Sequence, residues 1–150
     1  MSEVRRVSLA TLIDDPRFQT LVDEYTAESS IKDMPPINWQ RQMYQQLEAL
    51  GIFFVLAAYE RDELVGFMTM IVTVLPHYGA LTATTESVFV AAKHRSGGAG
   101  LKLIREAESW AKELGAVGLL LSAPYGGRLA DIAPRIGYRQ TNAVFFKGLQ

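Results

Sequence analysis

The residues best suited to chemistry lie in a glycine-rich turn, Arg95-Ser96-Gly97-Gly98-Ala99-Gly100, which joins an apolar strand to a helix with apolar residues at helical spacing. The first N–H groups of a helix have no intrahelical acceptor, and they lie at the positive end of the helix dipole. Glycine lets a backbone approach a ligand closely and adopt positive φ. The turn therefore predicts a site for phosphate oxygens, most simply those of a pyrophosphate.

Two common phosphate loops fit this turn poorly. A Walker loop needs Lys followed by Ser or Thr after its last glycine, and here Leu101-Lys102 follows. The dinucleotide fingerprint needs three glycines at fixed spacing and an acid about 20 residues further on, at the first strand of a parallel sheet. This turn instead follows antiparallel strands in the middle of the chain.

Glu86 is the second candidate, because it lies in an otherwise uncharged strand over residues 80–91. An unpaired carboxylate there would be costly. It is therefore either functional or paired with an Arg or Lys across the sheet. Alternation along the strand places it on the face shared with Val88 and Val90.

The elements that must position these residues follow from hydrophobic periodicity and from turn residues. We expect an α+β fold, a mixed and mostly antiparallel sheet flanked by helices. Apolar Trp39, Met43, Leu47 and Leu50 should share one face of the second helix. The expected order is an edge strand over 4–10, a helix after Pro16, a loop over 29–38, a helix from Asn38 to Gly51, strands over 52–59, 64–75 and 80–91, a helix from Gly98 to Gly115, a strand over 117–122, a short helix interrupted near Pro134, and one or two strands over 138–149.

Composition narrows the function. The 150 residues fit one domain, and the absence of cysteine excludes disulfides, thiolate metal sites and a cysteine nucleophile. With only two histidines we expect no metal site. A formal charge of −1 provides no global attraction to nucleic acid or membrane. No apolar run reaches the roughly 18 residues of a membrane span, so a soluble, cytoplasmic protein is expected.

The glycine-rich turn resembles the Gln/Arg-x-x-Gly-x-Gly/Ala loop of the GNAT acetyltransferase family, and the order of elements matches that family over almost the whole chain. Ile136-Gly137-Tyr138 is similar to the Leu-Gly-Phe/Tyr that closes the family's fourth helix. The resemblance implies a single GNAT domain over residues 1–150. It would transfer acetyl from acetyl-CoA to a primary amine without a metal.

The resemblance also implies how acetyl-CoA binds. The strand of Val88, Phe89 and Val90 should splay from the strand over 117–122 and pair with the pantetheine arm, which would leave the thioester beside Glu86. The residues expected to hold the pyrophosphate are Arg95, Ser96, Gly97, Gly98, Ala99, Gly100 and Leu101.

For catalysis, the resemblance makes Glu86 the candidate general base, because family members often carry a glutamate on this strand. The tyrosine that many relatives use as the acid corresponds to Ala133, and an asparagine often found at the start of that helix corresponds to Gly126. Tyr125, just beyond the strand over 117–122, is the candidate acid instead. A packing role for Tyr125, with water protonating the thiolate, is the alternative.

For the acceptor, we expect the loop over 29–38 and the turn over 76–79 to face each other across the mouth of the cleft. Asp33, His77 and Tyr78 are the candidate acceptor-binding residues, since loops carry specificity and histidine titrates near neutral pH. His77 could equally be an ordinary surface histidine.

Several alternatives stay open. The acceptor could be a small amine, an aminoglycoside-like compound, an amino acid, or a protein N-terminus or lysine. The same fold could also serve as a non-catalytic CoA-binding or protein-interaction module. A GNAT toxin acetylating aminoacyl-tRNA is a further reading, but the near-neutral charge offers it no phosphate-binding surface. Neither nucleic acid nor membrane is an expected partner, and a final strand shared between subunits would make a homodimer.

Overall fold

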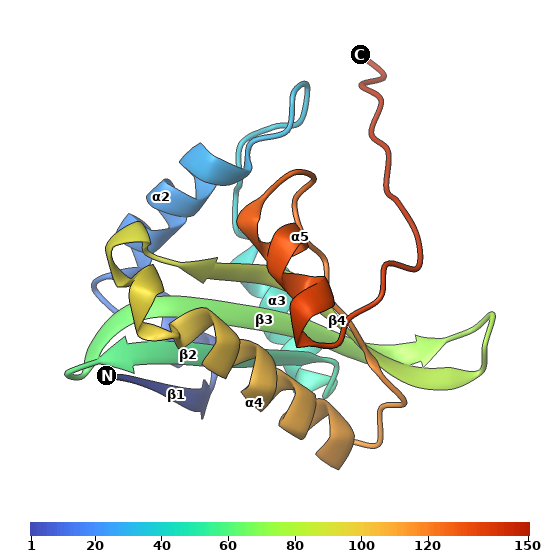
Figure 1. Cartoon of the computed structure of the whole chain (residues 1–150), viewed down its shortest axis with the longest axis horizontal. Coiled ribbons are helices and arrows are strands. Elements are labelled where there is room, and N and C mark those ends of the chain that lie inside the picture. The colour runs from blue at the N-terminus through green and yellow to red at the C-terminus, as the bar shows by residue number, and fades with distance from the viewer.

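The computed structural model describes residues 1–150 as a five-stranded sheet with helices on both faces (Figure 1). The strands are β1 (Ser2–Val7), β2 (Phe53–Glu60), β3 (Glu63–Leu75), β4 (Ala80–Val90) and β5 (Leu119–Leu120). The helices are α1 (Leu9–Ile13), α2 (Phe18–Ser29), α3 (Arg41–Ala49), α4 (Ala99–Glu113) and α5 (Arg128–Ile132), with 3₁₀ helices η1 (Ala92–Gly97) and η2 (Ala133–Ile136). None of the helices has the length and hydrophobicity that a membrane crossing requires.

The sheet order is β1-β2-β3-β4-β5, and each strand pairs with its neighbours in the sequence. The first four strands are antiparallel, whereas β5 pairs parallel to β4 after the crossover through α4. The expected fold class, the three-strand meander and the parallel last pair are all confirmed.

Two apolar layers hold the sheet between its helices. On one face, α1 and α2 bury Leu9, Leu12, Phe18 and Leu21 against Phe67 of β3 and its neighbours. On the other face, α4 buries its alanine and leucine stripe, with α5 and η2 beside it. Figure 1 shows α4 crossing the near face of the sheet, with α3 behind the strands. Glu86 must therefore face one helical layer or the other.

Three expected elements differ at their ends. The N-terminal strand stops at Val7, because Ser8 caps α1 by accepting the Thr11 N–H at 3.1 Å. Helix α3 begins at Arg41 rather than at Asn38. The strand expected over 117–122 is only Leu119–Leu120, because β5 pairs with β4 at two positions only.

The apolar face expected on the second helix is confirmed at Trp39 and Leu47, which pack against the core, but is wrong at Met43 and Leu50. Met43 is 59% exposed and Leu50 is 71% exposed, whereas Tyr44 and Leu47 pack against the core. The helix is therefore rotated about its axis relative to the expected orientation, and this turns Tyr44 toward the sheet.

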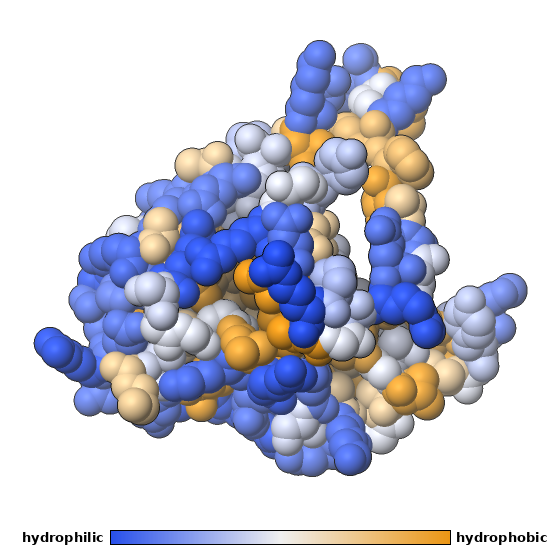
Figure 2. All heavy atoms as spheres, in the orientation of Figure 1, coloured by the Kyte–Doolittle hydropathy of each residue, from blue (hydrophilic) through white to orange (hydrophobic).

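The final strands expected over 138–149 are absent. The tail after Gly137 forms no ladder and stands away from the body of the molecule, with hydrophobic residues along it (Figures 1 and 2). A strand needs a partner for its N–H and C=O groups, and the tail does not run along the free edge of β5. Near its end it reaches Asp33, whose Cβ would lie 2.9 Å from a Cβ built on Gly148.

Candidate active site

The glycine-rich turn takes the shape of a 3₁₀ helix followed by a single left-handed residue. Gly98 has φ of 76° and directly precedes α4, and a Cβ built on it would meet nothing within 4 Å. The first i→i−4 bond of α4 runs from the Lys102 N–H to the Gly98 carbonyl at 3.1 Å. The N–H groups of Ala99, Gly100 and Leu101 therefore have no intrahelical acceptor. Free N–H groups at a helix start favour a bound anion, and the space that a Cβ on Gly98 would enter is open, so the role of this loop stays a prediction that the geometry permits.

Helix α2 holds this loop from one side through two carboxylates. The Ala92 N–H donates to Oε1 of Glu24 at 2.9 Å, and the Arg95 guanidinium donates to Oε2 of Glu28 at 2.6 Å. Arg95 also donates through Nε to the Val90 carbonyl at 2.8 Å. The side chain of Arg95 is therefore turned back onto β4 and α2, where it fixes the shape of the loop.

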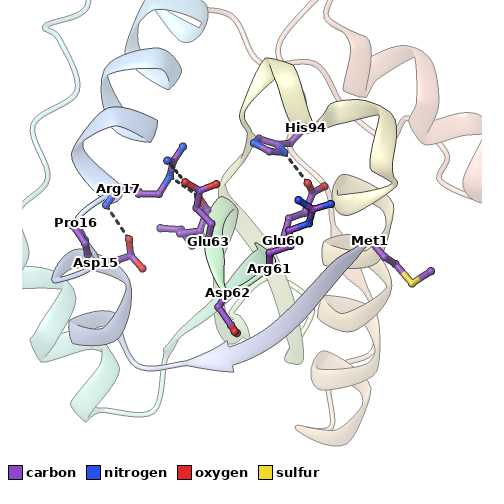
Figure 3. Close-up of a pocket in the computed structure, with 10 residues that line it drawn as sticks. Met1, Asp15, Pro16, Arg17, Glu60, Arg61, Asp62, Glu63 and His94 are labelled. Atoms are coloured by element: carbon purple, nitrogen blue, oxygen red, sulfur yellow. Dashed lines mark hydrogen bonds and ion pairs between the residues drawn. The ribbon is translucent and has the colours of Figure 1, made fainter.

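Strand β2 holds the loop from the other side. Nδ1 of His94 lies 2.8 Å from Oε2 of Glu60, and Figure 3 shows this pair at the rim of a pocket of about 690 Å³. The pocket is strongly charged, and several of its ionic groups are already paired, as Arg17 is with Glu63 and Asp62 is with Arg5. It lies beside the turn between β2 and β3, away from Glu86. We therefore place the chemistry elsewhere.

The expected parting of β4 from β5 is confirmed. The two strands pair only at Ala83 with Leu119 and at Thr84 with Leu120. One step further on, the Ser122 N–H donates to the side-chain oxygen of Thr85 at 2.9 Å instead of to a backbone carbonyl. From residue 86 to Val90, β4 thus has no β5 partner, and hydrophobic atoms are visible in Figure 2 between α4 and α5.

Glu86 lies at a β-bulge where this unpaired segment begins. Thr69 of β3 pairs with Ser87 and Met70 pairs with Thr85, so Glu86 is the extra residue. The bulge breaks the alternation, and both Glu86 and Ser87 point toward α2 and α3. The expectation that Glu86 shares a face with Val88 and Val90 is therefore wrong, since Val88 and Val90 pack on the α4 side.

Hydroxyl groups hold the Glu86 carboxylate. The Tyr44 hydroxyl donates to Oε1 at 2.6 Å, and the Thr69 hydroxyl donates to Oε2 at 2.7 Å. Oγ of Ser87 lies 2.6 Å from Oγ1 of Thr69, whose single proton is already given to Glu86, so Ser87 must be the donor. Glu86 forms none of the ion pairs of residues 1–150, which excludes the ion pair considered as the alternative to a functional role.

The environment keeps the neighbouring phenols neutral. Burial, and then the hydrogen bond to Glu86, raise the pKa of Tyr44 well above its ordinary value of 10.0. Burial, followed by the negative charge of Glu86, also raises the pKa of Tyr25. Tyr44 is therefore a proton donor in its hydrogen bond to Glu86 throughout the physiological range.

A cavity of about 190 Å³ opens beside Glu86, between β4, α2, α3 and the loop that joins the two helices. Its lining residues are Tyr25, Ile37, Asn38, Trp39, Tyr44, Glu86 and Ser87. Sequence reasoning missed Tyr44 and Thr69 as partners of Glu86. The spacing of Tyr44, three residues before Leu47, was the one signal that could have placed Tyr44 on the inner face of α3.

The other predicted site residues are not brought to this cavity. Tyr125 is fully exposed (106%) after β5. His77 and Tyr78 lie in the turn between β3 and β4, which projects from one end of the sheet (Figure 1). The centroids of their two rings are 5.0 Å apart. Asp33 lies in the α2–α3 loop with φ of 68° and contacts the tail. The roles of these four residues stay predictions.

Comparison with known proteins places the chain in a family. Residues 18–125 match the model of the acetyltransferase (GNAT) family, and the chain therefore belongs to this family. None of the curated proteins matches its sequence.

Solved structures share the fold at low identity. Glucosamine-6-phosphate N-acetyltransferase from Arabidopsis thaliana has a TM-score of 0.75 at 12% identity, over 98% of this chain and 97% of its own. Ribosomal-protein-alanine N-acetyltransferase from Brucella melitensis biovar Abortus 2308 has a TM-score of 0.74 at 18% identity, over 100% of both chains. An aminoglycoside acetyltransferase from an uncultured soil metagenomic sample, in complex with sisomicin, has a TM-score of 0.74 at 21% identity, over 99% of this chain and 97% of its own.

Proposed function

We propose that this protein is an N-acyltransferase that moves the acetyl group of acetyl-CoA to a primary amine. The observation that carries the proposal is the position of Glu86. Its carboxylate is fixed by two hydroxyl donors at the point where β4 leaves β5, and a cavity opens beside it. A proton acceptor is thereby held next to a free strand edge that leads to an anion site.

The chain offers acetyl-CoA two complementary surfaces. The N–H groups of Ala99, Gly100 and Leu101 suit the pyrophosphate. The unpaired edge of β4 from Val88 to Val90 offers backbone groups to the pantetheine amides, since extended segments add to open sheet edges in this way. The thioester would then lie near the bulge.

The reaction requires a neutral amine and a proton for the departing thiolate. Glu86 takes one proton from the ammonium form of the acceptor, directly or through water. The amine nitrogen then bonds to the thioester carbon, the carbon–sulfur bond breaks, and the second amine proton passes to the thiolate or to solvent. The products are the amide, free CoA and the proton held by Glu86, which leaves to solvent.

Tyr125 is our candidate for the proton donor to the thiolate, because it lies in the loop that follows β5. Its full exposure leaves the hydroxyl free to reach a thiol bound between β4 and β5. If Tyr125→Phe lowers kcat by less than about threefold, we assign this proton to water, since a positioned acid contributes about 10²-fold or more.

Thiol release from acetyl-CoA tests the proposal with a pool of primary amines and mass detection of the acetylated product. Gly98→Glu is the matched variant, because it places bulk and negative charge in the open space at the start of α4. The wild type should release thiol and gain thermal stability with acetyl-CoA. The variant should do neither, and an undiminished thermal shift in Gly98→Glu would remove this loop from donor binding.

A non-catalytic CoA-binding module is the second candidate, since Ala133 stands where many relatives carry the acidic tyrosine. Binding of acetyl-CoA without release of its thiol in the presence of any amine would favour such a module. Salt-sensitive binding of aminoacyl-tRNA would favour the toxin. The cytoplasmic location expected from the sequence stays a prediction.

A further inference from the structure

We propose that the acceptor is a cationic primary amine on an unbranched alkyl chain, with no acidic group beside the nitrogen. This inference rests on the proposed function and assigns the acceptor to the cavity beside Glu86. Neither the family nor the fold fixes this choice, because the related structures include enzymes named for a sugar phosphate and for aminoglycosides.

The charge of the cavity is the first argument. Glu86 is the sole ionic group among the seven lining residues, and its hydrogen-bond partners are neutral hydroxyls. The nearest cation of α3, Arg41, is paired with Asp14 at 3.0 Å. An acceptor ammonium would thus meet a carboxylate with no cation among the lining residues, whereas a carboxylate or phosphate beside the amine would meet like charge.

The walls of the cavity are the second argument. Tyr25, Trp39 and Tyr44 contribute three aromatic side chains, and the rings of Trp39 and Tyr44 lie 5.0 Å apart. Aromatic faces attract cations and pack well against methylene groups. Burial raises the pKa of Tyr25 and of Tyr44, so both phenols stay neutral and Glu86 remains the sole charge among the lining residues.

The size of the cavity is the third argument. About 190 Å³ is the space of roughly six waters at about 30 Å³ each. That space holds an ammonium group and a short run of methylenes. A sugar ring with several hydroxyl groups would place some of them against Ile37 and the ring faces of Trp39 and Tyr44, although Asn38 and Ser87 offer polar partners.

Three matched acceptors test the charge argument: n-pentylamine, 2-amino-1-hexanol and norleucine. 2-Amino-1-hexanol carries an alcohol beside its amine, and norleucine carries a carboxylate at the same position. Their amines are of similar basicity, so the comparison separates the effect of the negative charge from the effect of added bulk. Thiol release at saturating acetyl-CoA should give a kcat/KM for norleucine at least about 10-fold below that for 2-amino-1-hexanol, with n-pentylamine highest. A kcat/KM for norleucine equal to or above that for the alcohol would overturn the proposal.

A charge exchange at Asn38 locates the site. Asn38 lines the cavity from an exposed loop, and its side chain makes no hydrogen bond within the protein, so substitutions there should not affect folding. Asn38→Asp should raise the ratio of kcat/KM for 2-amino-1-hexanol to kcat/KM for norleucine. Asn38→Lys should lower this ratio and raise the KM for n-pentylamine about 10-fold. Equal ratios in both variants would show that the amine binds elsewhere.

Spermidine and a peptide with one lysine and a blocked N-terminus distinguish the two natural sources of this chemistry. If kcat/KM is higher with spermidine than with the peptide, the acceptor is a small polyamine. If kcat/KM is higher with the peptide, the acceptor is a protein lysine, and either result supports the proposal. Absence of thiol release with every amine would instead contradict the proposed function, whereas thiol release with norleucine preferred would contradict only this inference.

Discussion

At the scale of single residues, the site depends on a carboxylate that is accessible and yet held in place. Each oxygen of Glu86 accepts one hydroxyl proton, from Tyr44 and from Thr69, and each keeps a further lone pair for a substrate proton. No cation competes for the carboxylate. Glu86 is therefore oriented without being neutralised, as a general base requires.

The first prediction concerns Glu86→Gln. The amide cannot accept a proton from the acceptor, so kcat/KM should fall by about 10²-fold or more, while the affinity for acetyl-CoA stays unchanged. Glu86→Asp is the matched control, because it keeps the charge but is too short to hold both hydroxyl donors. Activity of Glu86→Gln within about threefold of wild type would show that Glu86 is structural.

The second prediction concerns Tyr44→Phe and pH. The pKa of Tyr44 is raised in the folded state, so its stabilisation is fully present below the unfolded value near 10 and is lost as pH rises above that value. The Tm of wild type should therefore fall more steeply than that of Tyr44→Phe above pH 10. Parallel curves of Tm against pH for the two proteins would exclude this linkage.

At the scale of elements, α2 joins the two halves of the site. Its Glu24 and Glu28 hold the glycine-rich loop, while Tyr25, on the same helix, lines the cavity beside Glu86. A displacement of α2 would thus disturb donor and acceptor binding together.

The third prediction tests this connection through Glu28→Gln. Loss of the charged partner should free the Arg95 guanidinium and weaken acetyl-CoA binding by about 3- to 10-fold, in line with a charge-assisted hydrogen bond between partly exposed groups. Asp23→Asn is the control on the same helix, because the only side-chain hydrogen bond of Asp23 is the one it accepts from Gln19. Calorimetric titration with acetyl-CoA measures the difference, and equal affinities in both variants would show that the loop holds its shape without the Arg95–Glu28 pair.

At the scale of the whole molecule, the tail is the feature least integrated with the fold. Val144, Phe145 and Leu149 are each about nine-tenths exposed, at 89%, 91% and 89%. Apolar side chains gathered in this way mark a contact surface. A homodimer formed through a shared final strand would cover them.

The fourth prediction concerns deletion of residues 140–150. Light scattering after size exclusion should show a dimer for the full chain and a monomer for the shortened one. The Tm of the monomeric fold should change by no more than about 3 °C, because so little tail surface is buried within one chain. A full chain that is monomeric at every concentration tested would contradict the dimer.

The sequence by itself determined the elements whose causes are local. Glycine readily adopts the positive φ that Gly98 needs in the turn before α4. The apolar stripe of α4 has a period of 3.6 residues. The polar turn at Arg61 and Asp62 joins two strands. The loop, the helix after it and the meander were therefore predictable, and so was the choice of Glu86 as the lone charge in its strand.

Tertiary structure decided what surrounds Glu86. The bulge opposite Thr69 and Met70 moves Glu86 to the α2 and α3 face, and the rotation of α3 brings Tyr44 to it. Both depend on how β3 pairs with β4 and on how α3 packs on the sheet. A one-residue shift in pairing reverses the face of every following side chain, and no local pattern in the sequence records that shift. The tail illustrates the converse, because its strand-like composition produces no strand where no edge lies beside it.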